Sequence, residues 1–258
     1  MNHVIILAAG RSTRMGGDTP KMLLDIGGKP LIQSLVDNIK PGNLGPITLI
    51  INEQSGPAIQ KMLGSEYQYV IQERQLGTGH AVAQAKSLLQ SKADNIIVVN
   101  GDHPFTRGET LREMVELHEK KQAVLTLLTV YVPNYKGVNQ ILYDYGRIIR
   151  DQDGHIDSIR ELKDCSPEEK AITEVNANFF CFQATWLWDY IEKITQANQQ
   201  KEYYLTDMVA MAIKHKQKVA TLSVSTVKEV IGVNTPQQLE LARKIVTERE
   251  PIVSSNKE

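Results

Sequence analysis

The sequence predicts an α/β protein in which helices cover a mostly parallel central sheet. Short apolar runs alternate with segments of helical periodicity, a rhythm typical of parallel strands joined by right-handed crossovers. The first run, residues 4–7, contains no alternating polar residues, which indicates a central strand buried on both faces. With 258 residues, 41% of them hydrophobic and 23% charged, the chain is long enough for one large domain of this class.

The first half of the chain alternates strands and helices. Further strands are predicted where apolar residues run without interruption, at 47–51, 67–71, 95–100 and 123–132. Helices are predicted where apolar residues recur every three or four positions, at 30–39, 57–63, 80–89 and 110–120. The first helix has the clearest limits, because Pro30 suits its first position and Pro41 and Gly42 stop the pattern.

The pattern changes at about residue 133. The segment 134–145 is predicted to form a loop or a short hairpin. The remaining strands are predicted at 146–150 and 155–159, which flank a turn, and at 174–182 and 219–224; the remaining helices are predicted at 185–194, 205–214 and 236–248. We therefore expect one domain over 1–250, with a hairpin-rich lobe at about 133–182 and a frayed tail at 251–258.

Charge, termini and cysteine content exclude several classes of protein. A net charge of −1 and a pI near 6.6 remove the electrostatic attraction to nucleic acid or an anionic membrane. The N-terminus shows no signal region, and no apolar run is long enough to span a bilayer. Cys165 and Cys181 form no disulfide framework or metal spacing, and the six scattered histidines show no zinc motif. We therefore expect a cytoplasmic protein without zinc.

The loop after the first strand carries small residues and two cations. Ala8, Ala9 and Gly10 leave room for a ligand on the backbone, whose N–H groups can act as donors. Arg14 and Lys21 add positive charge to a loop rich in Gly, Ser and Thr, which at the carboxyl end of a strand suits a polyphosphate. The spacing matches neither a P-loop nor a dinucleotide-binding turn, and an ordinary surface loop is the alternative interpretation.

Two other predicted strands end in polar groups. After the third strand, Gln72 offers an amide able to read a base edge, and Gly77 and Gly79 permit close approach. Asp102 follows the fourth strand, where a carboxylate can hold a hard divalent cation; the next helix starts too late for this residue to cap it. Because parallel strands end at one edge, we expect these groups to converge; the alternative for Gln72 is an ordinary polar connection.

Several motifs follow one another along nearly the whole chain. They are Leu-Ala-Ala-Gly-Arg-Ser-Thr-Arg-Met at 7–15, Pro-Lys at 20–21, Gln-Leu-Gly-Thr-Gly-His-Ala at 75–81, Gly-Asp at 101–102, Tyr-Gly-Arg-Ile at 145–148, Glu-Leu-Lys-Asp at 161–164, Glu-Val-Asn at 174–176, Glu-Tyr-Tyr-Leu-Thr-Asp at 202–207 and Gly-Val-Asn at 232–234. As an ordered set they resemble the N-acetylglucosamine-1-phosphate uridylyltransferase branch of the sugar-nucleotide pyrophosphorylases.

The resemblance implies a Rossmann-like three-layer nucleotidyltransferase fold with a mostly parallel mixed sheet and a small sugar-binding lobe. It also implies Mg²⁺-dependent transfer of UMP from UTP to N-acetylglucosamine 1-phosphate. Carried over residue by residue, it assigns the nucleotide to Leu7, Ala8, Ala9, Gly10, Gln72, Gly77 and Thr78, with Gln72 reading uracil. It assigns the triphosphate and catalysis to Arg14 and Lys21, magnesium to Asp102 and Asn234, and the sugar phosphate to Gly101, Gly146, Glu161 and Asn176.

The sequence departs from the family pattern in two places. Ser12 stands where the family usually has Gly, and Ala177 and Asn178 stand where it usually has Thr and Gly. The sugar is therefore less firmly implied than uridylyl transfer. One alternative is a nucleotidyltransferase of the same fold for another sugar 1-phosphate or nucleotide, such as one forming UDP-glucose or transferring a cytidylyl group. Another is a non-catalytic regulatory module that binds nucleotide sugars.

The bifunctional members of the family continue into a left-handed β-helix of hexapeptide repeats, which acetylates the amino sugar and forms trimers. Because this chain stops before such a region, the resemblance implies no acetyltransferase activity. We expect a monomer or small homo-oligomer whose partners are UTP and a sugar 1-phosphate.

Overall fold

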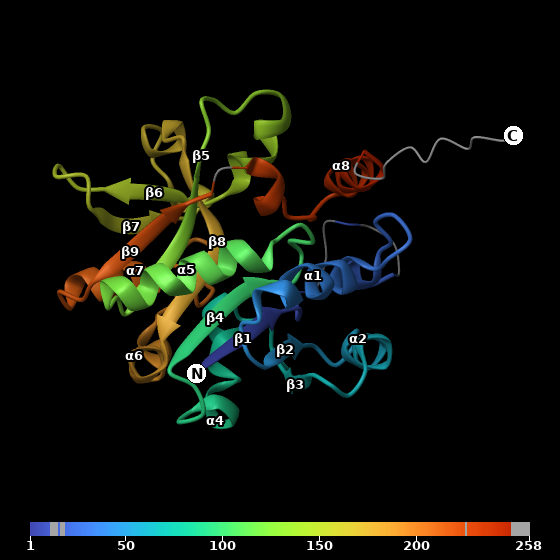
Figure 1. Ribbon diagram of the computed structural model, residues 1–258. Coiled ribbons are helices and arrows are strands. Elements are labelled where there is room, and N and C mark those ends of the chain that lie inside the picture. The colour runs from blue at the N-terminus through green and yellow to red at the C-terminus, as the bar shows by residue number, and fades with distance from the viewer. Residues whose placement is uncertain (11–14, 16–18, 225, 249–258) are drawn as a thin grey trace, which may run out of the picture.

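The computed structural model describes residues 1–10, 15, 19–224 and 226–248 (Figure 1). Two earlier predictions, the role of Arg14 and the frayed tail at 251–258, lie outside the described residues. The strands are β1 Asn2–Leu7, β2 Ile47–Ile51, β3 Gln68–Ile71, β4 Asn95–Asn100, β5 Leu125–Tyr131, β6 Arg147–Arg150, β7 Ile156–Arg160, β8 Glu174–Gln183 and β9 Val219–Ser223. They form one sheet in the order β3-β2-β1-β4-β8-β5-β9, and the β6–β7 hairpin joins it at β8.

The sheet combines a parallel part with a mixed part. β1 pairs in parallel with β2 and β4, and β2 pairs in parallel with β3. β8 runs antiparallel between β4 and β5, while β9 is parallel to β5. The predicted α/β class with a mostly parallel mixed sheet is confirmed.

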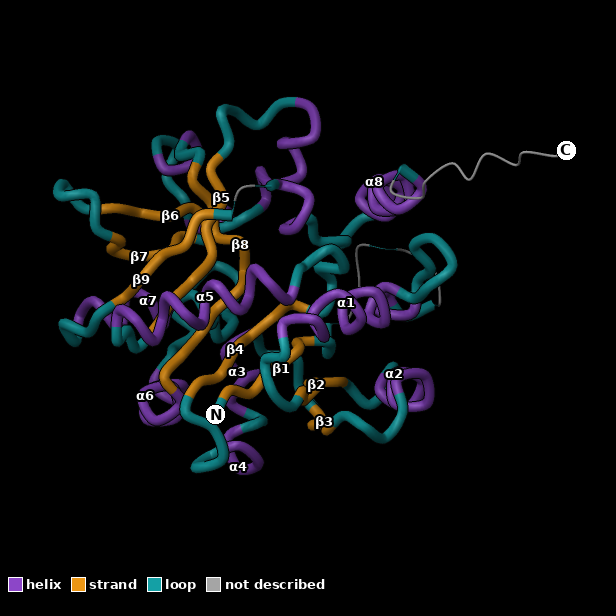
Figure 2. Tube along the Cα trace, in the orientation of Figure 1, coloured by secondary structure: helices purple, strands orange, loops and turns teal. Residues whose placement is uncertain are grey.

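Helices cover both faces of the sheet (Figures 1 and 2). One face carries α1 Leu31–Ile39, α2 Gly56–Leu63, α5 Gly108–Lys121 and α8 Pro236–Thr247. The other carries α3 Thr78–Ala83, α4 Lys86–Leu89, α6 Ala184–Tyr190 and α7 Asp207–Lys214. In β4, Ile97 and Val99 belong to the first apolar layer, and Ile96 and Val98 belong to the second. This burial on both faces explains the uninterrupted apolar runs in the sequence.

The prediction of one continuous helix at 80–89 is wrong, because α3 and α4 are separate. Between them, the backbone N–H groups of Gln84 and Ala85 donate to carbonyls only three residues back, those of Ala81 and Val82. Such bonds tighten the backbone and interrupt the α-helical ladder.

The prediction of a loop or hairpin at 134–145 is also wrong, because Gly137–Asp144 is a 3₁₀-helical segment. This segment folds around Arg147, which is fully buried at the start of β6. The guanidinium carbon lies 4.7 Å from the ring centre of Tyr135 and 5.1 Å from that of Tyr143. Attraction between the cation and these two rings compensates for part of its lost hydration.

Two sequence-based expectations can be compared with the described residues. Across 1–10, 15, 19–224 and 226–248, no helix is long and apolar enough to cross a membrane. Cys165 and Cys181 are both buried and free, as the lack of a disulfide framework predicts.

The strand ends that matter for ligand binding lie together. Leu7 at the end of β1 pairs with Ile50 of β2 and Asn100 of β4. Because β8 is antiparallel to β4, its first residues lie at this same edge. The edge therefore joins the N-terminal strand ends to the lobe formed by β6, β7 and the start of β8.

Candidate active site

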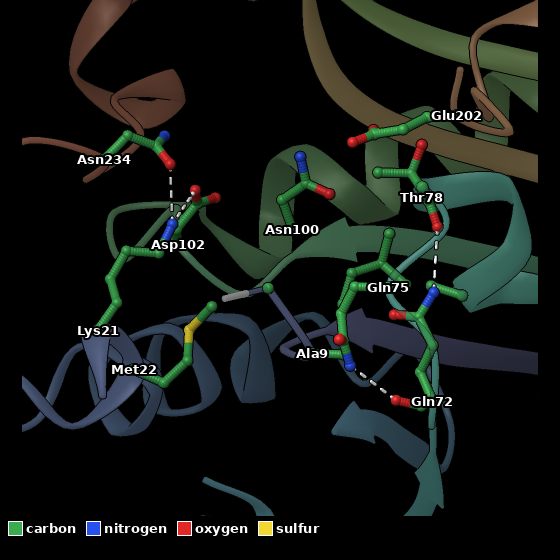
Figure 3. Close-up of a pocket in the computed structure, with 14 residues that line it drawn as sticks. Ala9, Lys21, Met22, Gln72, Gln75, Thr78, Asn100, Asp102, Glu202 and Asn234 are labelled. Carbon is green, nitrogen blue, oxygen red and sulfur yellow. Dashed lines mark hydrogen bonds and ion pairs between the residues drawn. The ribbon is translucent and has the colours of Figure 1, made fainter. Parts of the chain in front are cut away.

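A pocket of about 530 Å³ opens at the carboxyl edge of the parallel strands (Figure 3). The predicted site residues that line it are Leu7, Ala9, Gly10, Lys21, Gln72, Gly77, Thr78, Asp102 and Asn234. They come from the ends of β1, β3 and β4, from the 3₁₀ turn Lys21–Leu23, from the start of α3 and from the loop before α8. The structure thus brings together residues that are more than 200 positions apart in the sequence.

The floor of the pocket depends on small residues. The N–H group of Gly101 donates to the carbonyl of Leu7 at 2.9 Å, and a Cβ at position 101 would lie 2.8 Å from that oxygen. The side chain of Asn52 donates to the carbonyl of Ala9 at 3.0 Å. Ala8 is buried. Ala8 and Gly101 therefore support the pocket from behind and do not line it.

Lys21 places its ammonium group between the two predicted metal ligands. Its Nζ lies 2.8 Å from Oδ2 of Asp102 and 2.8 Å from Oδ1 of Asn234 (Figure 3). The side chains of Lys21 and Asp102 are only 8% and 13% exposed. Charges with so little access to water need partners, and here one cation is shared by a carboxylate and an amide oxygen.

The surroundings keep Asp102 ionised. Burial alone would raise the pKa of this carboxyl, but its electrostatic interactions and hydrogen bonds with Lys21 and His103 outweigh that effect and hold the pKa well below its usual range. An ionised carboxylate and an amide oxygen that converge on one point are oxygen donors of the kind that Mg²⁺ prefers. Since Mg²⁺ takes only one or two such ligands and completes its shell with phosphate and water, these residues fit it.

Gln72 occupies the other end of the pocket and is almost fully buried. Its Nε2 donates to the carbonyl of Gly77 at 3.2 Å and lies 2.9 Å from Nδ1 of His80. Burial, assisted by Arg74, lowers the pKa of His80, so its neutral ring can accept this bond. With its N–H groups used in this way, Gln72 can offer its carbonyl oxygen to a ligand donor.

The turn into α3 is held against the segment before α7. Gly77 has a φ of +111°, and a Cβ there would lie 2.6 Å from the carbonyl oxygen of Tyr203. The hydroxyl of Thr78 accepts from the backbone N–H of Leu205 at 3.0 Å. Both predicted residues therefore also have a structural role, and this packing brings Glu202 to the wall of the pocket.

The lobe residues predicted to hold the sugar form a second cluster outside the lining of this pocket. The N–H group of Asn176 donates to the carbonyl of Gly146 at 2.8 Å, and a Cβ at Gly146 would lie 3.4 Å from Oε1 of Glu161. The hydroxyl of Thr206 donates to Glu161 at 3.0 Å, and burial raises the pKa of this glutamate. Asn176 is fully buried.

Asn178 takes a backbone conformation that favours glycine, with a φ of +64°. Its Oδ1 accepts from Nδ2 of Asn176 at 2.8 Å, and its N–H group donates to Oδ1 of Asn176 at 3.0 Å. Asn is among the few other residues that often adopt this conformation, which explains why it can replace the family's glycine. The amide of Asn176 is thereby engaged by its neighbour rather than turned to the pocket.

Other lining residues were missed by the sequence analysis: Met22, Gln75, Ala81, Asn100 and Glu202. Asn100 carries a signal that could have identified it, since it is the polar last residue of a buried strand. Gln75 and Ala81 belong to a motif that the sequence analysis quoted without assigning them a role. Glu202 likewise opens the quoted motif at 202–207, which received no site role, and Met22 reaches the pocket through tertiary packing that no local pattern indicates.

Within the described ranges, one group of three or more His, Cys, Asp or Glu side chains has its potential ligand atoms within 4.8 Å of one another, at Asp151, Asp153 and His155. All three are exposed in the β6–β7 turn. Oδ1 of Asp151 accepts from the backbone N–H groups of Asp153 and His155 at 3.0 and 2.8 Å. The turn itself therefore accounts for this arrangement.

Comparison with known proteins places these residues in a family context. Residues 4–200 match the MobA-like NTP transferase domain. The chain is 37% identical over 247 residues to the bifunctional protein GlmU of Enterococcus faecalis, covering 96% of this chain and 52% of that protein. It is 38% identical over 246 residues to the protein of the same name in Geobacter metallireducens, covering 95% and 50%. The chain thus spans about half the length of these relatives.

A solved structure shares the whole architecture. It is a putative glucose-1-phosphate thymidylyltransferase from Bacillus anthracis in complex with a sucrose, with a TM-score of 0.77. The superposition covers 97% of both chains at 19% sequence identity, so this similarity concerns the fold.

Proposed function

Because the chain belongs to the MobA-like NTP transferase family, we propose that it transfers UMP from UTP to N-acetylglucosamine 1-phosphate and releases pyrophosphate, with Mg²⁺ as cofactor. The observation that carries the proposal is the convergence of Lys21, Asp102 and Asn234 at one end of a pocket whose other end presents Gln72. On this proposal, the phosphates and the cation would occupy one end of the pocket and the base would occupy the other.

The base end suits uracil. Because the amide nitrogen of Gln72 is engaged by Gly77 and His80, its carbonyl oxygen is the group left to meet the N3–H donor of uracil. The backbone at Ala9 and Gly10 also lines the pocket, where small residues would admit the ribose and phosphates.

The cation end suits a triphosphate. When bound, Mg²⁺ supplies charge neutralisation for the phosphates, and Asp102 and Asn234 would hold it. Lys21 now donates to these same two oxygens, and with Asp102 and Asn234 engaged by the cation its ammonium would be available to a phosphate oxygen. Lys21 would then stabilise the negative charge that develops on the leaving pyrophosphate.

The reaction requires positioning rather than a covalent nucleophile. An oxygen of the sugar phosphate attacks the α-phosphorus in line, a new P–O bond forms, and the bond to the bridging oxygen of the leaving pyrophosphate breaks. The attacking oxygen is already ionised, so no general base is needed. The chain contributes orientation at both ends of the pocket and positive charge at the reacting phosphates.

A second candidate is the same reaction with another sugar 1-phosphate. Asn178 favours it, since its side chain ties up the amide of Asn176 in the region predicted to hold the sugar. A different set of donors near the sugar would change which hydroxyl or acetamido group is recognised.

Pyrophosphate release from the purified protein tests both candidates. We expect turnover with UTP, Mg²⁺ and N-acetylglucosamine 1-phosphate to exceed that with glucose 1-phosphate, N-acetylgalactosamine 1-phosphate or CTP. Asp102→Asn should abolish it, while Asp151→Asn, a matched change at an exposed carboxylate in the lobe, should not.

Each other outcome has a defined meaning. Preference for another sugar supports the second candidate, and preference for CTP indicates a cytidylyltransferase. Binding of UTP without pyrophosphate release from any pair of substrates contradicts the enzymatic proposal and indicates a non-catalytic nucleotide-sugar-binding module.

A further inference from the structure

His103 lies directly behind the cation end of the pocket but does not line it. Its side chain is only 3% exposed, and its Nδ1 lies 2.7 Å from Oδ1 of Asp102. Because an ionised carboxylate can only accept, Nδ1 is the donor of this bond. One oxygen of Asp102 is therefore engaged from behind, and the other, Oδ2, faces Lys21 in the pocket.

The far side of the ring reaches Tyr145. Nε2 of His103 lies 3.3 Å from the Tyr145 hydroxyl. That hydroxyl donates to the carbonyl of Val230 at 2.6 Å and accepts from the N–H group of Gly232 at 2.9 Å. Tyr145 thus holds the loop that leads to Asn234, and His103 connects this loop to Asp102.

Packing fixes the ring between these partners. Phe179 of β8 contacts His103 edge to face, with ring centres 5.2 Å apart. A Cβ at Gly232 would lie 3.1 Å from Cε1 of His103 and 3.1 Å from the Tyr145 hydroxyl. The N–H group of Val233 donates to the backbone carbonyl of Asp102 at 2.9 Å. The ring therefore has little freedom to leave its bond with Asp102.

We propose that His103 is a positioning residue that turns the carboxylate of Asp102 so that a single oxygen faces the divalent cation, in register with the amide oxygen of Asn234. The inference rests on the proposed function, because it assigns His103 a part in building the cation site of that reaction. Groups that hydrogen-bond to a ligating carboxylate orient it, and their loss commonly weakens metal affinity by about 10- to 100-fold.

Two substitutions separate this role from simple packing. His103→Leu fills much of the same space but removes the donor to Asp102. His103→Asn is smaller but keeps an N–H donor near the position of Nδ1. A role in packing alone predicts that leucine is the better replacement, whereas positioning predicts that asparagine is.

Mn²⁺ titrated into the protein, followed by the loss of the free-ion signal in electron paramagnetic resonance, measures cation binding at the site without turnover. We expect His103→Leu to weaken Mn²⁺ binding by about tenfold or more and His103→Asn to stay within about threefold of the wild type. Tyr145→Phe should have an intermediate effect. The inference would be overturned if His103→Leu bound Mn²⁺ as tightly as the wild type. It would also be overturned if Asp102→Asn bound Mn²⁺ as tightly as the wild type, because the ion would then not occupy this site.

A measurement on the wild type covers the case in which His103→Leu does not fold. The ¹⁵N resonance of His103 Nδ1 should shift when Mg²⁺ is added, because the carboxylate that it contacts then binds the cation; an unchanged resonance would contradict the inference. Mn²⁺ binding that depends on Asp102 and His103, in a protein that releases no pyrophosphate, would refute the proposed function and leave this inference standing.

Discussion

Among the described residues that line the pocket, Lys21 is the only one with a cationic side chain. It is nearly buried, and its two partners at 2.8 Å are the groups best suited to a metal ion. The same ammonium group can therefore bind either these two protein oxygens or the phosphates of a ligand. This makes Lys21 the residue whose loss should affect catalysis most directly.

Lys21→Met should lower kcat by about 100-fold or more, because it removes a cation aimed at the developing charge of the leaving pyrophosphate. Lys29→Met is the matched control, since Lys29 is 61% exposed and pairs with Asp37 at the surface. Kinetics of pyrophosphate release over a range of UTP concentrations provide kcat and KM for both variants. A Lys21→Met protein with kcat within about threefold of the wild type would contradict the assigned role.

Asp207 at the start of α7 allows a prediction of pH dependence. Burial, with a contribution from the neighbouring Asp164, raises the pKa of Asp207 from its ordinary 3.8 to about 6. A carboxyl whose pKa is raised in the folded state contributes fully to stability at pH values below its ordinary pKa of 3.8. This contribution to stability is lost as the pH rises through about 6. The folded protein is therefore stabilised less by Asp207 at neutral pH than by an uncharged residue of the same shape.

Asp207→Asn should raise the melting temperature by about 2–4 °C near pH 7.5, with the gain fading at about pH 4.5, where the wild-type carboxyl is largely protonated when folded. The positive end of the α7 dipole favours the aspartate and keeps the expected gain modest. Thermal melts at the two pH values test this, with Asp189→Asn on the exposed face of α6 as control. A gain of equal size at both pH values would exclude titration of Asp207 as its cause.

At the scale of elements, the start of α5 packs through two glycines against the 3₁₀ turn Lys40–Gly42, which directly follows α1. A Cβ on Gly42 would lie 2.4 Å from the carbonyl oxygen of Gly108, and a Cβ on Gly108 would lie 2.4 Å from the backbone nitrogen of Gly42. These contacts are with backbone, which cannot rotate away as a side chain can. The start of α5 therefore approaches this turn as closely as it does only because both residues are glycine.

Gly108→Ala should destabilise the protein by about 2 kcal/mol or more, because the added methyl group forces the two backbone segments apart. Gly42→Ala should destabilise the protein similarly. The double variant should lower the free energy of unfolding by less than the sum of the two single effects, because one separation of the backbones accommodates both methyl groups. Denaturant unfolding measures all three, with Glu113→Ala on the exposed side of α5 as control. Additive effects would indicate that the two positions are strained independently.

The sequence predicts the elements well where burial dictates the pattern. The central strands were predicted because both of their faces are buried, as Ile96 to Val99 in β4 show. The break between α3 and α4 was missed, because it depends on two three-residue hydrogen bonds and not on a Gly or Pro. The 3₁₀ segment was missed because its cause, the buried Arg147, lies outside it in the sequence.

The candidate site was predictable to a similar degree. Lys21, Asp102 and Gln72 could be predicted because each follows a strand that ends at the same edge. The contacts of His103 with Asp102 and Tyr145 could not, because the ring's orientation depends on packing against Phe179 and Gly232. Local sequence thus identifies the groups that face a ligand more readily than the groups that hold them in place.

At the scale of the whole molecule, β8 joins the lobe to the sheet. Its first half pairs with β6 at Val175, and its second half lies between β4 and β5. Phe182 in this second half pairs with Ile96 and Leu125 and is fully buried. Because one strand serves both regions, we predict that the lobe does not unfold separately from the sheet.

Phe182→Leu tests this prediction, because it weakens packing between β4 and β5, away from the lobe. The substitution should cost about 1 kcal/mol, and native-state hydrogen exchange should show the same loss of protection at Ile97 in β4 and Ile148 in β6. Thr185→Ala on the surface of α6 is the control and should change neither amide. If Ile97 loses protection while Ile148 keeps it, the lobe opens as an independent unit, and the nucleotide and sugar parts of the proposed site would have to be assembled by ligand binding rather than by folding.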